Sequence, residues 1–325
     1  MADVSGRDRG QLFLVGALVI ATLLVVLALF LNSGIYAQNV AARNADPGVT
    51  GAVEYRRAAV DATAGTMTRL NREDPENNDN DDLEARMAAW SNGTAVHGAY
   101  RGKGRAVTVS EASGTLIGQN ATRRFTNATN SSVDWYLVDD TGGDGTGGIR
   151  DYRMNVSQTD TLDISGFNAT ELEDNAFHAR IEGSGGTYDV YVGTNATGAT
   201  EAINVTVDDG TPASCEEPFG ADGRASVNLT NASVAGARCS ALADLADASP
   251  DYTIEYRNPM AINGTYELIV LDGGTIPSNN FNDDPDDGSP WTADAVYSAN
   301  VTVFYRARSV TYGTTVEVVP GEELS

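Results

Sequence analysis

Basic residues are scarce in this chain, and lysine occurs only once, at Lys103. The 325 residues carry 21 Lys and Arg against 45 Asp and Glu, which gives a formal net charge of −24. Phosphate binding needs an excess of Lys and Arg, so we expect no nucleic-acid partner. With only two histidines, two cysteines and no cofactor motif, the composition also argues against a metalloenzyme and predicts no cofactor.

Recognisable catalytic motifs are also missing. His97 and His178 lie far apart in the sequence, and there is no His-Glu-x-x-His, no Gly-x-Ser-x-Gly and no Walker A motif. Pairs of carboxylates carry no information, because so many acidic residues produce such pairs by chance. We therefore expect a protein that is not an enzyme.

One long apolar run is present, from Leu12 to Leu31, and it contains no charge. At about 1.5 Å per residue, a helix of this length covers about 30 Å, the thickness of the hydrocarbon core. The run predicts a retained transmembrane helix, since no small-x-small cleavage site stands out after it. Arg7 and Arg9 precede the run, which favours a cytoplasmic N-terminus. We expect a single-pass protein of the cell membrane with its C-terminal domain extracellular.

The N-x-S/T acceptor for N-glycosylation occurs about three times as often as the composition predicts by chance. This excess favours an extracellular glycoprotein, although the abundance of Asn and Thr alone accounts for several of the acceptors. The candidate acceptors are Asn92, Asn120, Asn127, Asn130, Asn155, Asn168, Asn195, Asn204, Asn228, Asn231, Asn263 and Asn300.

The whole net negative charge lies after residue 42, where every basic residue except one lysine is an arginine. A solvated acidic surface with almost no lysine is expected in molar salt, where the Debye length is about 3 Å and self-repulsion is screened. We expect a halophilic, archaeal source. The alternative is an ordinary acidic protein, in which lysine would be nearer to arginine in number.

Cys215 and Cys239 are the only cysteines. Two cysteines in an exported protein pair more often than they serve as catalytic thiols, and here no CxxC motif and no nearby histidine suggests otherwise. We expect a disulfide, which would stabilise the fold by about 3.5 kcal/mol in the chain-entropy model.

The pattern of the chain predicts an α+β fold in four parts. A cytoplasmic leader, 1–10, is followed by the transmembrane helix and its exit, 11–43, a helical stalk region with an acidic loop, 44–94, and a β-rich extracellular domain, 95–325. In the third part, an amphipathic helix over 51–71 follows from the spacing of Val53, Val60, Ala64 and Met67. The acidic loop is expected over 73–82, and a short helix follows it through Leu83, Met87 and Trp90.

From residue 95 the apolar pattern alternates with period two, which predicts a mainly antiparallel, sandwich-like β domain. One helix, over 233–246, is expected to interrupt the strands and to carry Cys239. The order of the strands is left open. The expected strands are 106–109, 133–138, 149–156, 161–165, 177–182, 188–192, 202–207, 225–229, 252–256, 266–271, 295–305 and 314–319.

The acidic segment 281–290 suggests a cation site. Counting from Asp283 places Gly288 at the glycine position of an EF-hand loop, but Pro285 and Asp294 occupy positions where ligands belong. A solvated acidic loop is the interpretation we favour, and weak calcium binding is the alternative. The weak candidate ligands are Asp283, Asp284, Asp286 and Asp287.

The segment Asp8-Arg9-Gly10-Gln11 stands directly before the apolar run. It resembles the signal of archaeal type IV pilin-like proteins, archaellins in particular. More closely, about the first 60 residues, and the ending 295–320, look like a haloarchaeal family of single-pass membrane proteins of unknown function with pilin-like N-termini. The resemblance implies cleavage between Gly10 and Gln11 by a prepilin peptidase, and packing of the helix against other pilin-like subunits.

Two departures refine this resemblance. Val15 stands where a bacterial-type pilin would place a glutamate, and the external part is much larger than in a typical adhesion pilin. The size favours a minor or tip subunit over a bulk filament subunit.

Three functional hypotheses follow. The leading one is a non-enzymatic, pilin-like, membrane-anchored surface glycoprotein that contacts lipid through Leu12 to Leu31. The second is a single-pass envelope protein that binds a carbohydrate, a cation or a partner protein without entering a filament. The third is an exported hydrolase with no recognisable motif.

Overall fold

The computed structural model describes residues 47–73, 81–139, 148–183, 186–196, 201–246, 252–272 and 274–320. The expected leader, the Gly10 and Gln11 processing site, the apolar run from Leu12 to Leu31 and most of the acidic loop lie outside these residues. Among the helices that are described, none combines the length and the apolar character needed to cross a membrane.

Helices and strands follow one another as a mainly β structure. The helices are α2 (Pro47–Glu73), α3 (Asp81–Ala99), α4 (Ala169–Asn175) and α5 (Ala243–Ala246), with 3-10 turns at η2 (Ser240–Leu242), η3 (Pro259–Ala261), η4 (Ser278–Asn280) and η5 (Pro285–Asp287). The strands are β1 (Gly104–Arg124), β2 (Trp135–Val138), β3 (Ile149–Ser157), β4 (His178–Gly183), β5 (Gly186–Asn195), β6 (Ala202–Asp208), β7 (Ala213–Pro218), β8 (Arg224–Asn228), β9 (Ser233–Val234), β10 (Ala237–Arg238), β11 (Tyr252–Arg257), β12 (Asn263–Leu271), β13 (Trp291–Arg306) and β14 (Thr311–Val318).

The strands form two antiparallel sheets. The first has eight strands in the order β10-β9-β8-β3-β12-β1-β13-β14, and the second has six in the order β2-β11-β4-β5-β6-β7. The two sheets share one hydrophobic core, which includes Phe125, Tyr152 and Tyr266 from the first sheet side and Tyr256 and Val190 from the second. The prediction of a β-rich, antiparallel fold is confirmed.

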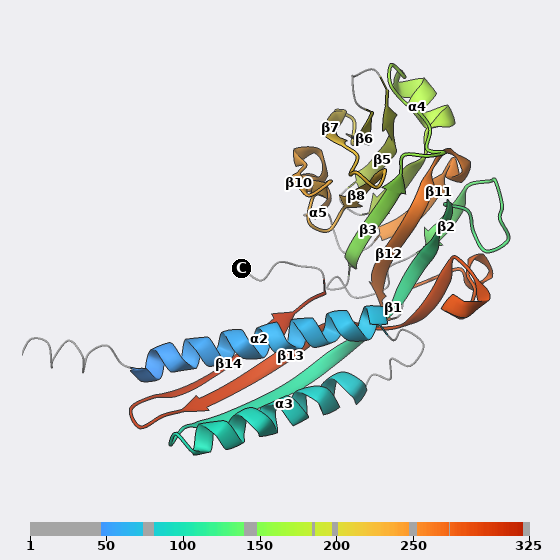
Figure 1. Cartoon of the computed structure of the whole chain (residues 1–325). Coiled ribbons are helices and arrows are strands. Elements are labelled where there is room, and N and C mark those ends of the chain that lie inside the picture. Colours follow the sequence, from blue (N-terminus) through green and yellow to red (C-terminus); the bar gives the residue numbers. More distant parts are fainter. Residues whose placement is uncertain are drawn as a thin grey trace, which may run out of the picture.

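Strands β1 and β13 are long enough to serve two parts of the molecule (Figure 1). A bulge at Tyr297 marks the change: Ala112 pairs with Ser298, but Ser113 pairs with Val296. On one side of the bulge the strands belong to the two-sheet part, which we call the head. On the other side they join β14 and carry α2 and α3, and we call this part the stalk.

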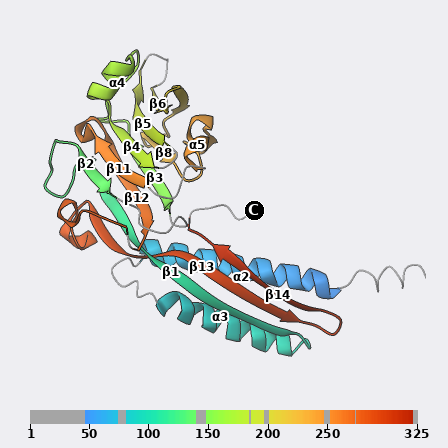
Figure 2. The same ribbon diagram turned by 180° about the vertical axis from the view of Figure 1, so that it is seen from behind.

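The stalk is a single layer of helices on a three-stranded section of sheet (Figure 1). Helix α2 buries Ala52, Tyr55, Ala59, Met67 and Leu70 against β13 and α3. The predicted helix is present and extends beyond 51–71 at both ends. The predicted apolar face was wrong at one position, because Val53 lies on the exposed side. The opposite face of the sheet, with Thr302, Phe304 and Arg306 exposed, is not covered by either helix (Figure 2).

Several local expectations need correction. The region 233–246 is not one helix but β9, β10, η2 and α5. Ala232, Ala235 and Gly236 all have positive φ, so the chain reverses there in a tight hairpin that a helix cannot accommodate. The predicted strand 161–165 forms only an isolated bridge, and the predicted start of the β domain at residue 95 falls inside α3.

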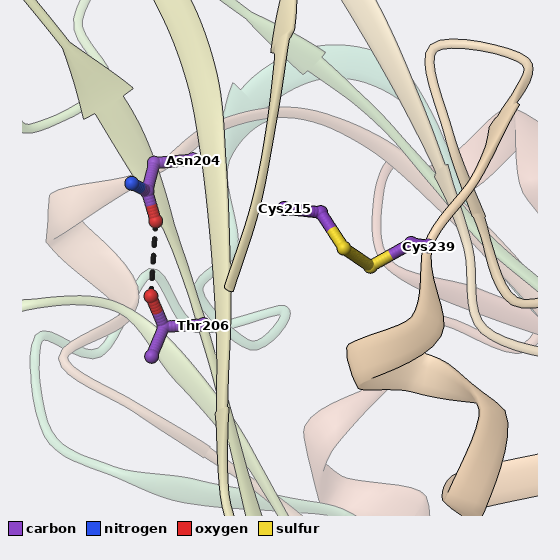
Figure 3. The surroundings of a disulfide bond; sticks show 4 residues. All are labelled: Asn204, Thr206, Cys215 and Cys239. Carbon is purple, nitrogen blue, oxygen red and sulfur yellow. Dashed lines mark hydrogen bonds between the residues drawn. A yellow bond between two sulfur atoms is a disulfide. The ribbon is translucent and has the colours of Figure 1, made fainter. Parts of the chain in front are cut away.

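Cys215 and Cys239 form the expected disulfide, with Cα atoms 5.8 Å apart (Figure 3). Cys215 lies on β7, the edge strand of the six-stranded sheet. Cys239 directly follows β10, the edge strand of the eight-stranded sheet. The bridge therefore joins the two sheets at the same edge of the head.

Candidate functional site

The C-terminal end of α2 is fastened to the junction of stalk and head by Asn71. This buried side chain donates from Nδ2 to the carbonyl oxygen of Val296, at 3.0 Å, and its Oδ1 accepts from the N–H of Val296, at 2.9 Å. Strand β14 ends at Val318, opposite Ala299, and so does not reach Val296. Asn71 thus takes the place of a strand and satisfies backbone groups that would otherwise be buried without partners.

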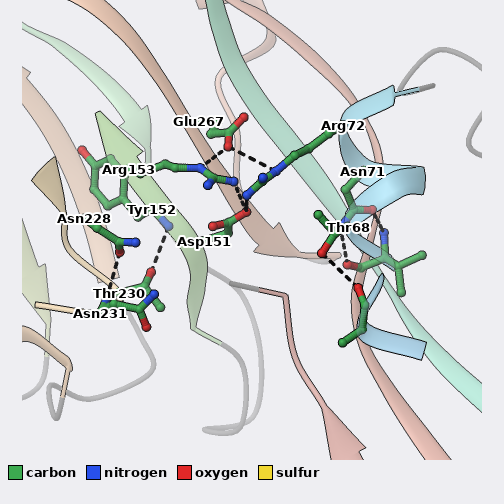
Figure 4. A network of polar contacts seen from close by, with 12 residues as sticks. Thr68, Asn71, Arg72, Asp151, Tyr152, Arg153, Asn228, Thr230, Asn231 and Glu267 are labelled. Atoms are coloured by element: carbon green, nitrogen blue, oxygen red, sulfur yellow. Dashed lines mark hydrogen bonds and ion pairs between the residues drawn. The ribbon is translucent and has the colours of Figure 1, made fainter. Parts of the chain in front are cut away.

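Next to this fastening, Arg72 enters a group of four charges, which we call the junction quartet (Figure 4). Its Nη2 lies 3.1 Å from Oδ2 of Asp151, and its Nε lies 3.6 Å from Oε1 of Glu267. Arg153 contacts the same two acids, at 2.7 Å from Asp151 and through a hydrogen bond from its Nε to Glu267. The quartet is a closed ring of alternating charge that joins α2 to β3 and β12.

Asp151 is the most perturbed member of the quartet. Its side chain is only 10% exposed, and this burial raises its pKa from 3.8 to about 7, against the opposing effect of Arg72. The neighbouring Glu267 raises the pKa further, and burial also raises the pKa of Glu267 itself. Asp151 also has a positive φ of 51°, at a break in the pairing of β3 with β12. Strained backbone and a shifted pKa at one residue are typical of a functional position.

A pocket of about 380 Å³ opens beside the quartet, on the outer face of the eight-stranded sheet. Its polar lining includes Asn120, Asn155, Ser226 and Thr265, and Arg72, Arg153 and Glu267 of the quartet form one side. Trp291 forms another wall. Trp291 as a residue is 6% exposed, and its buried indole Nε1 has no hydrogen-bond partner among the residues that the structure describes.

Gly118 makes room for this tryptophan. A Cβ atom at residue 118 would lie 2.6 Å from the ring of Trp291, closer than side-chain atoms approach one another. The indole therefore lies directly against the backbone of β1, a close approach that only glycine permits.

The asparagines of the candidate N-glycosylation motifs are dispersed over the molecule, and they differ in exposure. Asn127 is buried, and its amide is held by Thr129, Ser131 and Asn280. Half-buried acceptors are Asn195, Asn204, Asn228 and Asn263, and the exposed ones are Asn92, Asn120, Asn130, Asn155, Asn168, Asn231 and Asn300. Figure 3 shows Asn204 accepting a hydrogen bond from Thr206 of its own acceptor motif.

The weak cation candidates lie on the loop before β13. Asp284 accepts from the N–H of Asp286 and so caps the 3-10 turn η5, which leaves this carboxylate with a structural role. Asp283 and Asp284 share a shallow pocket with Asp294. Within the described ranges, however, no group of three or more His, Cys, Asp or Glu side chains has a geometry that could hold a metal ion.

The two histidines occupy different parts of the molecule. His97 is exposed near the end of α3, whereas His178 is buried on β4 in the head. Burial lowers the pKa of His178, whose Nδ1 lies 3.2 Å from the carbonyl oxygen of Ala176. The fold does not bring the histidines together into one site.

Comparison with known proteins adds one similarity. A family model described as "Family of unknown function (DUF7261)" matches residues 6–131, which is less than half of the chain. The match includes α2, α3 and the whole of β1, and it ends before β2. Neither the curated proteins nor the solved structures contain a match to the chain. The similarity therefore extends over the apolar run and the two stalk helices, and it carries no functional assignment.

Proposed function

We propose that the protein is a membrane-anchored, non-enzymatic surface protein of the pilin-like type, whose stalk holds the head away from the membrane. The observation that supports this most is the direction of α2. Its first residue, Pro47, lies at the end of the stalk that is farthest from the head (Figure 1). Only residues 32–46 separate Pro47 from the apolar run. If that run spans the membrane, the stalk points the head outward.

The pilin-like part of the proposal rests on the N-terminal resemblance and on the arrangement of the stalk. Helix α2 follows the apolar run in sequence and lies along an antiparallel sheet. A large head on such a stalk suits a minor or tip subunit, because bulk subunits must pack side by side along a filament. The acidic, acceptor-rich surface is that of a glycosylated protein in a salt-rich medium.

N-terminal processing tests this proposal. In cells that contain a prepilin peptidase, the mature chain should begin at Gln11, and intact-mass measurement of the membrane fraction gives the answer. Gly10→Val should leave the leader uncleaved, because it changes the residue before the expected cut. The control, Gly6→Val, adds the same bulk inside the leader and should be processed normally. A wild-type chain that keeps residues 1–10 would contradict the pilin-like route.

A second candidate function is carbohydrate binding in the pocket beside the junction quartet. With both acids ionised the quartet balances its own charge, and the remaining polar lining consists of amides and hydroxyls, which suits a neutral, hydroxyl-rich ligand. Trp291 places an aromatic wall beside these polar groups, and an apolar ring next to hydrogen-bonding side chains is the usual lining of a small-ligand site. This is the observation that favours a ligand over a purely structural junction.

Calorimetric titration with neutral oligosaccharides tests the second candidate. Trp291→Leu removes this aromatic wall, so affinity should fall about tenfold, the order of one lost aromatic contact. Trp90→Leu, on α3 in the stalk, is the matched control and should bind as the wild type does. Equal affinities for all three proteins, or no binding of any oligosaccharide, would rule out the pocket as the site.

A further inference from the structure

Three segments meet at the end of the stalk that is farthest from the head, and we call this end the base. They are the first turns of α2, the turn 100–103 between α3 and β1, and the turn 307–310 between β13 and β14 (Figure 1). A Cβ atom at Gly51 of α2 would lie 2.6 Å from the hydroxyl of Tyr305 and 3.4 Å from Nζ of Lys103. The base is therefore one continuous surface built from distant parts of the sequence.

The base reverses the charge of the rest of the molecule. The base together with the adjoining parts of the stalk, residues 47–60, 92–110 and 299–316, contains Glu54 as its only acidic residue, in a chain with a net charge of −24. No cation of the base forms an ion pair with a described residue, whereas Arg72 and Arg180, toward the head, are both paired with acids. The cations of the base are Arg56, Arg57, Arg101, Lys103, Arg105, Arg306 and Arg308.

Large apolar side chains are also exposed at the base. Tyr100, in the turn after α3, is 87% exposed, the highest value for any large apolar side chain described. Four more belong to the same end of the stalk: Val49, Val53, Val96 and Phe304. Exposed apolar groups among cations are unfavourable in water, so this surface is suited to a partner with both anionic and apolar character.

Two of the cations are held in place by aromatic rings. The guanidinium of Arg105 lies 5.0 Å from the centroid of the Tyr55 ring, and Nζ of Lys103 lies 5.9 Å from that of Tyr305. Cation–π contacts of this kind leave the charged groups free to bind an anion while they fix their position. The only lysine of the chain is thus one of the cations that lie at the base.

We infer that the base is a docking surface for the anionic headgroups of the membrane into which the chain is anchored. Lys and Arg side chains next to exposed aromatic and apolar groups are typical of surfaces that rest at the lipid–water interface. The inference rests on the proposed function, because the apolar run that precedes α2 would bring the base to the bilayer. A second copy of the chain could offer acidic groups, but its acidic surface would not cover Tyr100 and the exposed valines.

High salt does not prevent this docking. In molar salt the Debye length is about 3 Å, so only direct pairing of a guanidinium with a headgroup phosphate persists. Exposed turn residues such as Arg308 can make that contact. The cations of the turns also lie far from the apolar run in sequence. The positive-inside rule counts only residues near the run, so these cations do not alter the expected orientation.

Hydrogen exchange of the full chain in vesicles tests the inference, at a salt concentration at which the chain is fully folded. One set of vesicles contains phosphatidylcholine alone, and the other contains phosphatidylcholine with phosphatidylglycerol. Amides of the turns 100–103 and 307–310 should exchange more slowly with the anionic vesicles. Arg308→Glu should reduce this protection at least about fivefold, given the usual effect of one basic residue at an anionic surface. Arg238→Glu, at a residue that is also exposed but lies on the head, should leave this protection unchanged.

Vesicle flotation in the same samples separates the two proposals. If the chain floats with both kinds of vesicle but its turns exchange equally in both, the docking inference is overturned while the membrane anchor stands. If protection appears without anionic lipid and grows with protein concentration, the base binds a second copy and the inference is again overturned. If the chain floats with neither kind of vesicle, the anchor itself is refuted, and the docking inference with it.

Discussion

Replacing Cys215 and Cys239 together by serine should lower the free energy of unfolding by about 3.5 kcal/mol, the value that the chain-entropy model gives for a loop of this length. The disulfide should matter most locally. It joins the edge strands of the two sheets, and among the described strands β7 pairs only with β6. Without the bridge, β7 and the β9-β10 hairpin are expected to open before the rest of the head.

Chemical denaturation of the oxidised wild type and of the double variant measures this loss. Reduction of the wild type under mild conditions is the control, since it breaks the bridge without adding a serine hydroxyl at buried Cys239. Hydrogen exchange should then rise first in β7 and in the hairpin. Equal denaturation midpoints for the oxidised, reduced and substituted proteins would contradict the proposed role of the bridge.

The second large effect concerns Asp151. Its pKa is raised from 3.8 to about 7 in the folded protein, so between these values the folded state binds a proton that the unfolded state has lost. The Asp151 contribution to the free energy of unfolding should therefore decrease as the pH rises from about 4 to about 7. The decrease is at most about 4 kcal/mol, since one pKa unit corresponds to about 1.4 kcal/mol.

Asp151→Asn mimics the protonated side chain and should remove this component. The measurement is the difference in the free energy of unfolding between wild type and variant across this pH range, at constant salt. Asp160→Asn is the matched control, because Asp160 also has a positive φ and pairs with an arginine, Arg124, but is exposed. Parallel pH profiles for wild type and Asp151→Asn would show that Asp151 does not titrate in this range.

The titration changes the charge of the junction near neutral pH. Below a pH of about 7, Asp151 is mostly protonated, and Glu267 is then the only carboxylate of the quartet left to hold Arg72 and Arg153. The end of α2 is still fastened by Asn71, whose hydrogen bonds to Val296 involve no ionisable group. The junction therefore combines a pH-sensitive contact with a pH-insensitive one.

Local sequence signals predicted the elements better than their exact faces. The spacing of Val60, Ala64 and Met67 found α2, but Val53 does not continue their face, because the buried stripe turns through Ala52, Tyr55 and Ala59 instead. In the first half of α2, small and aromatic residues make the contact with β13. The spacing of large apolar residues alone does not show which face of the helix is buried.

Strand β1 shows how glycine conceals a strand. The sequence predicts only 106–109 of this strand, and Gly114 and Gly118 lie in the part that was missed. Both glycines mark close contacts: a Cβ atom at Gly114 would lie 2.6 Å from the carbonyl oxygen of Val270, and one at Gly118 would strike Trp291. Such contacts depend on neighbours far away in the sequence, so no local pattern reveals them.

The junction quartet was not predicted for the same reason. Arg153 and Glu267 become neighbours only through the pairing of β3 with β12, and Arg72 comes from a helix that precedes both. One signal was available, since Glu267 interrupts the otherwise apolar end of β12. A charge inside an apolar strand needs a partner, but the sequence does not say which of the arginines supplies it.

The long pairing of β1 with β13 has a mechanical consequence. It runs from Gly104 opposite Arg306, at the base, to Gly118 opposite Trp291, inside the head. A tension that pulls the head away from the base acts along both strands, so their covalent backbones carry the load and the hydrogen bonds between them are not opened one after another. No flexible linker lies between the two ends of these strands, so a force on the head would reach the base with little extension of the chain.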